Sequence, residues 1–220
     1  WLKRLFSKLR CDACSDPSEA IAAISSMMRS ALVYEFGKDI DEGITKITVG
    51  SIPRPEACGD DEVVVSVKSC CINYPDLMNT ANAHQHKQEL PFVPGMEYAG
   101  VIKKVGGKVK NLNTGDRVIV SGKGMAEEVV VHHRACSPMP AAYTFSQGAS
   151  FTVGYTTAYH CLVERGRLQP GETVLVHGAT GGMGMAAVQL ARAIGAKVIG
   201  TGGADHKLAV VKAQGAEHVI

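Results

Sequence analysis

The sequence predicts an antiparallel, barrel-like β domain followed by the first half of a doubly wound α/β sheet. Three observations support this class. Short β-branched runs broken by Gly, Pro, Asn and Asp fill the first half of the chain, a glycine-rich turn lies at 177–184 between an apolar strand and an apolar helix, and strand and helix patterns alternate from there onward. The chain divides accordingly into an extension at 1–28, a barrel domain at 29–145 and a partial α/β domain at 146–220.

Composition favours a small-molecule partner over nucleic acid or a membrane. The 220 residues are 45% hydrophobic, which is enough apolar content for a substantial core. The 23 basic and 21 acidic residues leave a net charge of only +2, and aromatic residues make up 5%, so neither a basic footprint nor a base-stacking surface is predicted. No apolar run approaches the roughly 18 residues that a membrane-spanning helix needs.

The extension carries two patterns. Residues 1–10 hold four basic side chains, no acid and apolar positions at helical spacing. This pattern resembles an organellar transit segment, but it fits a surface amphipathic helix or an upstream linker equally well, so cytoplasm and mitochondrion both stay open. Asp16 as N-cap, followed by Pro17 and Glu19, predicts a short helix that runs to Met27.

Seven cysteines are scattered along the chain without the spacing of a disulfide scaffold, which indicates a reducing compartment. Cys11 and Cys14 have the spacing of a thiol or metal pair. No second pair follows at zinc-site spacing, so we expect no metal there.

The barrel domain is predicted from short strands bounded by turn residues. The stretch 79–90 is polar and has neither strand nor helix periodicity, so it is expected to be a surface loop. The six predicted strands are 31–34, 44–49, 63–67, 98–105, 117–120 and 128–131.

The α/β domain begins with a helical stretch at 146–163. A continuous apolar strand at 173–176 is typical of a parallel sheet that is buried on both faces, and the helix at 185–194 is apolar almost all round. Strand, helix, strand, helix, strand is half of a sheet that has about six strands when complete, so the chain looks C-terminally incomplete. The later elements are a glycine cap at Gly195, a strand at 197–201, a helix from an Asp205 cap to Gln214, a closing Gly215, and a strand at 217–220.

The glycine loop predicts dinucleotide binding in a Rossmann fold. Ala179 takes the place of the first fingerprint glycine, Gly181 lets the backbone approach a pyrophosphate, and Gly184 lets the helix pack closely on the strand. The helix start also offers free N–H groups and the positive end of its dipole. The expected cofactor contacts in the loop are Ala179, Thr180, Gly181, Gly182, Met183 and Gly184.

The end of the second strand favours NADPH over NADH. An NAD-binding protein normally has an acid about 20 residues after the loop. Gly202 and Gly203 stand there instead, and His206 and Lys207 could face a ribose 2′-phosphate. Lys207 also fits a solvated helix position almost equally well.

Several segments resemble the zinc-free quinone oxidoreductases of the medium-chain dehydrogenase/reductase superfamily. The resemblance runs in order through residues 30–220 and leaves the first 28 uncovered. Its segments are 71–77, 90–100, 115–118, 149–159 and 168–184.

This resemblance implies a GroES-like barrel packed against a Rossmann domain, with cofactor and acceptor in the cleft between them and a homodimer as the complete assembly. It places Asn73 near the nicotinamide, Thr156 near the cofactor and Lys207 near the adenosine phosphate. Tyr74 fits a cleft residue or ordinary core. Met78 stands where some members have a tyrosine, so the resemblance supports no acid role there.

The same comparison predicts no zinc. Zinc-dependent relatives have a Cys at the position of Asn73 and a His at that of Met96, which leaves Glu97 as a single possible ligand where a catalytic zinc needs three. Glu97 is instead a buried acid that needs a partner, expected to be an Arg or Lys. Cys70 and Cys71 are expected to be buried or half-buried thiols on opposite faces of a strand, and His132 and His133 fail as a metal pair for the same reason.

The function expected from these features is metal-free transfer of reducing equivalents from NADPH to a quinone or similar electron-poor acceptor. With the resemblance, Asn73 is expected to donate a hydrogen bond to a developing oxyanion; the residue pattern alone favours a strand-end residue that bonds to its own backbone. The alternatives are an enoyl or alkenal reductase of the same superfamily, and a non-catalytic NADPH-binding protein. Because half of the sheet is present, we expect these 220 residues alone to bind NADPH weakly or not at all and to be inactive.

Overall fold

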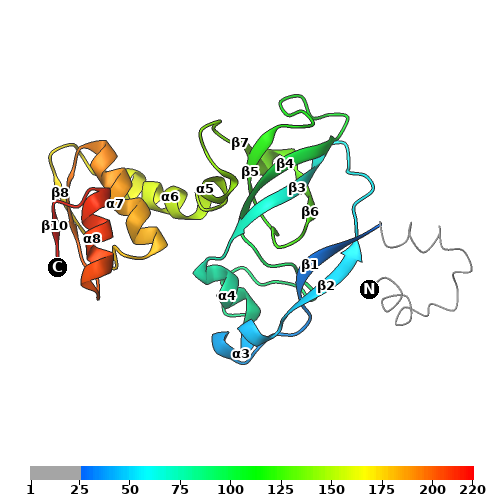
Figure 1. The fold of residues 1–220 in the computed structure, drawn as a ribbon, viewed down its shortest axis with the longest axis horizontal. Helices are drawn as coiled ribbons and strands as arrows, with labels where there is room; N and C mark the ends of the chain where they lie inside the picture. The colour runs from blue at the N-terminus through cyan, green and yellow to red at the C-terminus, as the bar shows by residue number, and fades with distance from the viewer. Residues whose placement is uncertain (1–25) are drawn as a thin grey trace, which may run out of the picture.

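The computed structural model describes residues 26–220 and shows two units joined by a run of helices (Figure 1). The first unit is built on antiparallel strands, and the second on parallel strands with helices against them. The predicted order of an antiparallel domain and then half of a parallel α/β sheet is confirmed. The transit pattern, Cys11, Cys14 and nearly all of the predicted first helix lie outside the described residues.

The first unit contains a five-stranded sheet in the order β6-β3-β4-β5-β7 and a separate β1–β2 ribbon. Valines from the central strands fill the core, where Val63, Val65 and Val118 are completely buried. Each of the six predicted strands overlaps an observed one, and β7 was not predicted. The strands are β1 (Met27–Val33), β2 (Ile47–Pro53), β3 (Glu62–Cys71), β4 (Glu97–Val105), β5 (Arg117–Ser121), β6 (Glu128–His132) and β7 (Cys136–Pro138).

The strand predicted at 44–49 begins only at Ile47, because the helix α3 (Ile40–Thr45) precedes it. The Asp39 side chain caps that helix by accepting a hydrogen bond from Glu42 N at 2.9 Å. This local bond outweighs the strand preference of the β-branched residues at the helix end.

Met27 also differs from its prediction, because it begins β1 instead of ending a helix. It pairs with Pro53 in the antiparallel β1–β2 ladder, which extends from there to Val33. The ladder supplies backbone hydrogen bonds over seven residue pairs, so tertiary pairing outweighs the helical signal of the preceding sequence. A further helix, α4 (Tyr74–Thr80), fills the segment before the predicted surface loop.

The second unit has the predicted alternation of strands and helices. Its three parallel strands lie in the order β10-β9-β8, so β8, the first of the three along the chain, is at one edge. Gly195 ends the helix that connects β8 and β9, with φ +93°, a left-handed conformation that suits glycine. The bridging segment consists of α5 (Phe145–Ala149), α6 (Thr152–Tyr159) and a π-helical turn (His160–Arg165). The elements of the second unit are β8 (Thr173–Val176), α7 (Gly182–Ile194), β9 (Lys197–Gly200), α8 (Asp205–Gln214) and β10 (His218–Val219).

Helix α5 falls at the predicted boundary between the domains, and it packs on the first unit. Its Ala149 forms a small core with Ala99 of β4 and Ile119 of β5. The 145/146 boundary therefore stays a prediction, while in the structure α5 and α6 together bridge the two units (Figure 1).

Two details of the second unit differ from their predictions. Leu175 of β8 is 51% exposed, although Val174 and Val176 beside it pack in the core formed with α7 and α8. Strand residues alternate between faces, so burial of Leu175 requires a layer on the other face of the sheet. Asp205 is the first residue of α8, and Ala204, with extended backbone, takes the N-cap position.

We expect Gly184→Ala to lower the free energy of unfolding by about 1–3 kcal/mol. An added Cβ would lie 2.3 Å from Gly178 O and 2.6 Å from the Ala179 Cα, so α7 would have to move away from the end of β8. Urea unfolding followed by circular dichroism measures the change. The matched control is Gly182→Ala, where nothing lies within 4 Å of the added atom, and an equal loss in both variants would contradict the close packing.

Candidate functional site

A cleft with a volume of about 770 Å³ lies between the two units. The first unit contributes Glu97 and residues 71–75, where β3 ends and α4 begins, and the second contributes the glycine loop and the start of α7. The start of α6 completes the lining. This volume is in the range of small-molecule binding sites.

The glycine loop leads the chain from β8 into α7. Gly178 has φ +63°, and Gly181 is the N-cap of the helix. Ala179 is completely buried, and its backbone N donates to Thr201 O at 2.9 Å, which ties the loop to the end of β9. Residues 181–184 line the cleft. The N–H groups of the first helical turn have no acceptor within the helix, and they lie at the positive end of the helix dipole.

Asn73 stands at the junction of β3 and α4 and is the N-cap of that helix. Its Nδ2 donates to Glu97 Oε1 at 3.0 Å, and its backbone N donates to Asp76 Oδ2 at 2.9 Å. Both the main chain and the side chain of Asn73 are therefore fixed at the wall of the cleft.

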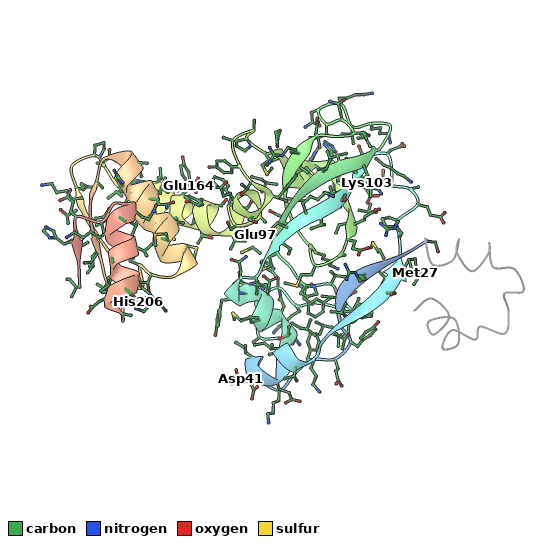
Figure 2. All side chains as sticks on the ribbon, in the orientation of Figure 1. Met27, Asp41, Glu97, Lys103, Glu164 and His206 are labelled. Carbon is green, nitrogen blue, oxygen red and sulfur yellow. The ribbon has the colours of Figure 1, made fainter. Side chains whose placement is uncertain are left out.

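Glu97 lies where β4 meets the helices that join the two units, and it is 1% exposed (Figure 2). Besides Asn73 Nδ2, it accepts a hydrogen bond on Oε2 from Val153 N at 2.9 Å, in the first turn of α6. The prediction that Glu97 pairs with an Arg or Lys is therefore wrong. An amide and a helix N-terminus solvate the charge instead, because the helix dipole and its free N–H groups favour a carboxylate there.

Asp76 holds the main chain of Asn73, a role that was not predicted from the sequence. Its side chain is 2% exposed, and Oδ1 accepts from Gly95 N at 3.0 Å and Met96 N at 2.9 Å. One carboxylate thus ties the start of α4 to the segment that leads into Glu97. An Asn followed three residues later by an acid, with Pro75 between them, is a helix-start pattern that could have revealed this role.

Of the other predicted site residues, some line the cleft and others do not. Tyr74 is at the cleft, 65% exposed. Thr156 is exposed on α6 and does not line the cleft, whereas its neighbour Thr157 does. Gly202 packs against Thr180, since a Cβ on Gly202 would lie 2.6 Å from Thr180 Cγ2. Neither of these two residues lines the cleft, and neither does the exposed Lys207.

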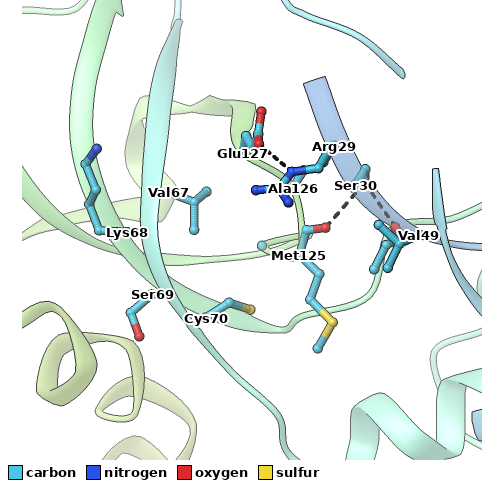
Figure 3. Close-up of a pocket in the computed structure, with 12 residues that line it drawn as sticks. Arg29, Ser30, Val49, Val67, Lys68, Ser69, Cys70, Met125, Ala126 and Glu127 are labelled. Carbon is cyan, nitrogen blue, oxygen red and sulfur yellow. Dashed lines mark hydrogen bonds and ion pairs between the residues drawn. The ribbon is translucent and has the colours of Figure 1, made fainter. Parts of the chain in front are cut away.

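The adjacent cysteines at the end of β3 face different cavities, as strand geometry predicts. Cys71 lines the cleft, whereas Cys70 lines a shallow hollow beside Met125 (Figure 3). Burial raises the pKa of the Cys70 thiol to about 12, and burial together with the nearby Glu97 carboxylate raises the pKa of Cys71. Both thiols are protonated at neutral pH, so neither is an activated nucleophile.

Within residues 26–220, no three His, Cys, Asp or Glu side chains cluster as a metal site would require. The prediction that His132 and His133 point to opposite faces is wrong, because His133 begins a 3-10 turn after β6 and the two rings stack with their centroids 4.8 Å apart. The absence of a metal from the reaction stays a prediction. In the same range, no helix combines the length and the apolar character needed to cross a bilayer.

Sequence comparison gives matches to oxidoreductases. Residues 59–141 match the alcohol dehydrogenase GroES-like domain. A quinone oxidoreductase-like protein 2 homolog of Nematostella vectensis is 44% identical over 90% of this chain and 58% of its own length, and a quinone oxidoreductase of Pongo abelii is 35% identical over 91% and 60%. Its homologues are therefore quinone oxidoreductase-like proteins of the medium-chain dehydrogenase/reductase superfamily. It spans about 60% of the length of these relatives.

Solved structures agree with this assignment. A probable oxidoreductase from Mycobacterium abscessus has a TM-score of 0.80 and 34% identity over 88% of this chain and 61% of its own. A mycobacterial protein in complex with NADPH has a TM-score of 0.77 and 29% identity over 88% and 57%, and the CurK enoyl reductase has 0.75 and 26% over 88% and 59%. The predicted GroES-like domain followed by a partial Rossmann sheet is confirmed.

We expect Glu97→Gln to lower the free energy of unfolding by about 1–3 kcal/mol. Glutamine has one acceptor atom where two donors converge, so either Asn73 Nδ2 or Val153 N would face another N–H group. Chemical denaturation measures the loss. Glu217→Gln, at an exposed glutamate, is the matched control, and an unchanged stability of Glu97→Gln relative to it would contradict the bridge.

Proposed function

We propose that the protein is an NADPH-dependent oxidoreductase that passes reducing equivalents to a quinone or similar electron-poor acceptor without a metal ion. One observation carries this proposal: the glycine loop and the Asn73 amide, from different units, line a single cleft. The quinone oxidoreductase among the relatives and the NADPH-bound mycobacterial structure support it.

The glycine loop would bind the pyrophosphate. The backbone N–H groups of Gly182, Met183 and Gly184 belong to the first turn of α7, and all three residues line the cleft. Gly182 has open space where a Cβ would stand, so a phosphate group can approach the backbone there. The loop therefore suits the cofactor that the fold implies.

The first unit would hold the acceptor. Ile72 and Tyr74 are 66% and 65% exposed at the cleft and offer apolar surface to a planar molecule. Bound NADPH supplies the reducing equivalent. The Asn73 amide carries two N–H groups, of which one donates to Glu97, and the other is the donor that we assign to the negative charge developing on the acceptor oxygen.

The preference for NADPH rests on the end of β9. Gly202 and Gly203 provide no carboxylate for a ribose 2′-hydroxyl, and Gly203 has open space around it. Lys207, exposed in the first turns of α8, supplies the charge that would attract a 2′-phosphate.

An enoyl or alkenal reductase is the second candidate, because the CurK enoyl reductase shares the fold. A carbonyl-conjugated C=C bond develops the same negative oxygen as a quinone when it accepts hydride, so the Asn73 amide suits both. Assays of the whole protein with NADPH, menadione and hexenal separate the two. Faster turnover of hexenal would favour the second candidate, and binding of NADPH without turnover of either would favour a non-catalytic role.

We expect millimolar NADPH to shift the backbone amide signals of residues 181–184 in NMR spectra of the isotope-labelled whole protein. Lys207→Gln should weaken NADPH binding at least about fivefold and leave NADH binding unchanged, because it removes one charge-assisted contact. Lys212→Gln, on the same helix, is the matched control. A glycine loop whose signals do not respond to NADPH would contradict the proposal.

A further inference from the structure

A hollow with a volume of about 610 Å³ adjoins the cleft on the first unit. It lies between the start of α3 and the two ends of α4, and we call it the α3–α4 hollow. Tyr74 lines both this hollow and the cleft, and it is 65% exposed. A molecule that lies on Tyr74 in the cleft and extends past the ring therefore enters the α3–α4 hollow.

The walls of the α3–α4 hollow are held in place because α3 packs closely on α4 (Figure 1). Gly43 of α3 is buried, and a Cβ there would lie 2.3 Å from Thr80 Oγ1 of α4. The backbone N of Gly37, which precedes α3, donates to Thr80 O at 3.0 Å. The two helices cannot approach each other more closely, so the hollow is a preformed space.

Much of the lining is apolar. Ile40 is half-buried, and Ala81 and Ala83 offer only methyl groups. The Asp39 carboxylate, also in the lining, is already engaged as the cap of α3, where it accepts from Glu42 N at 2.9 Å. No residue of the lining has a buried side-chain polar atom that lacks a partner. A hydrocarbon chain can therefore leave water against this surface without covering an unpaired polar group.

The charges at the rim disfavour an anionic group. Asp39 and Asp41 bring two carboxylates to the lining, and Lys38 is its one basic residue. The Lys38 ammonium is 4.0 Å from a Glu42 carboxylate oxygen, which partly offsets its charge. Asp41, at the start of α3, forms no ion pair within residues 26–220 (Figure 2). A carboxylate or phosphate on a ligand would meet net negative charge there.

We propose that the α3–α4 hollow receives a neutral hydrocarbon tail of the acceptor. The electron-poor ring lies in the cleft at Tyr74, and the tail lies against Ile40, Ala81 and Ala83. This inference rests on the proposed function, and it narrows the substrate class to uncharged quinones or related acceptors that carry an alkyl chain.

The test compares dimethoxymethylbenzoquinone without a tail, with a pentyl tail, and with a carboxybutyl tail of the same length. Calorimetry measures the binding of each compound to the whole protein saturated with NADP⁺, so that no turnover occurs. We expect the pentyl compound to bind at least about tenfold more tightly than the bare ring, because several methylene groups leave water. The carboxybutyl compound should bind no more tightly than the bare ring.

Two variants of α3 distinguish the α3–α4 hollow from unspecific contact with hydrocarbon. Ile40→Asn should weaken binding of the pentyl compound at least about fivefold and leave binding of the bare ring unchanged, because Ile40 does not line the cleft. Ile44→Asn is the matched control on the same helix. Ile44 is 41% exposed and does not line the hollow, so this variant should bind all three compounds like the unmodified protein.

Oxidation of NADPH by the same compounds tests the proposed function separately. Binding that depends on the tail and on Ile40, without NADPH oxidation, would contradict the activity and leave the α3–α4 hollow as the site of the tail. Four results would overturn the inference: equal affinity for the bare ring and the pentyl compound, no binding of the pentyl compound at millimolar concentration, equal gains from the pentyl and carboxybutyl tails, or equal binding of the pentyl compound by the two variants.

Discussion

The Glu97 carboxylate brings a negative charge into the junction between the two units, where bulk water does not reach it. A buried charge of this kind requires donors on both oxygens. Asn73 Nδ2 supplies one from the first unit, and Val153 N supplies the other from the helix that leads to the second. The same interaction therefore solvates the charge, orients the amide at the cleft and fixes the start of α6.

The rest of the cleft follows from backbone constraints around this bridge. Asp76 holds the main chain of Asn73 and the segment before Glu97 through three backbone N–H groups. On the other wall, Gly184 allows α7 to approach the end of β8, which turns the first helical N–H groups toward the cavity. The proposed chemistry asks mainly for such positioning, because the cofactor provides the reducing equivalent.

Patterns that depend on neighbours in the chain were predictable from the sequence. The glycine loop, the Gly195 cap and the alternation of β8, α7 and β9 each follow from local residue types. The partners of Glu97 were not predictable, because Val153 is 56 residues away and donates through its backbone, which no side-chain pattern reports. The exposure of Leu175 likewise depends on which face the helices cover, and the difference between Thr156 and Thr157 depends on the rotation of α6.

Hydrogen exchange at the Val153 amide tests the central role of Glu97 most directly. Val153 is in the first turn of α6, where an N–H has no acceptor within the helix, so protection there must come from the Glu97 carboxylate. The bridge predicts slow exchange of this amide in the unmodified chain and fast exchange in Glu97→Leu, whose side chain has no acceptor, under conditions where both are folded. Fast exchange in the unmodified chain, or equal protection in both, would contradict it.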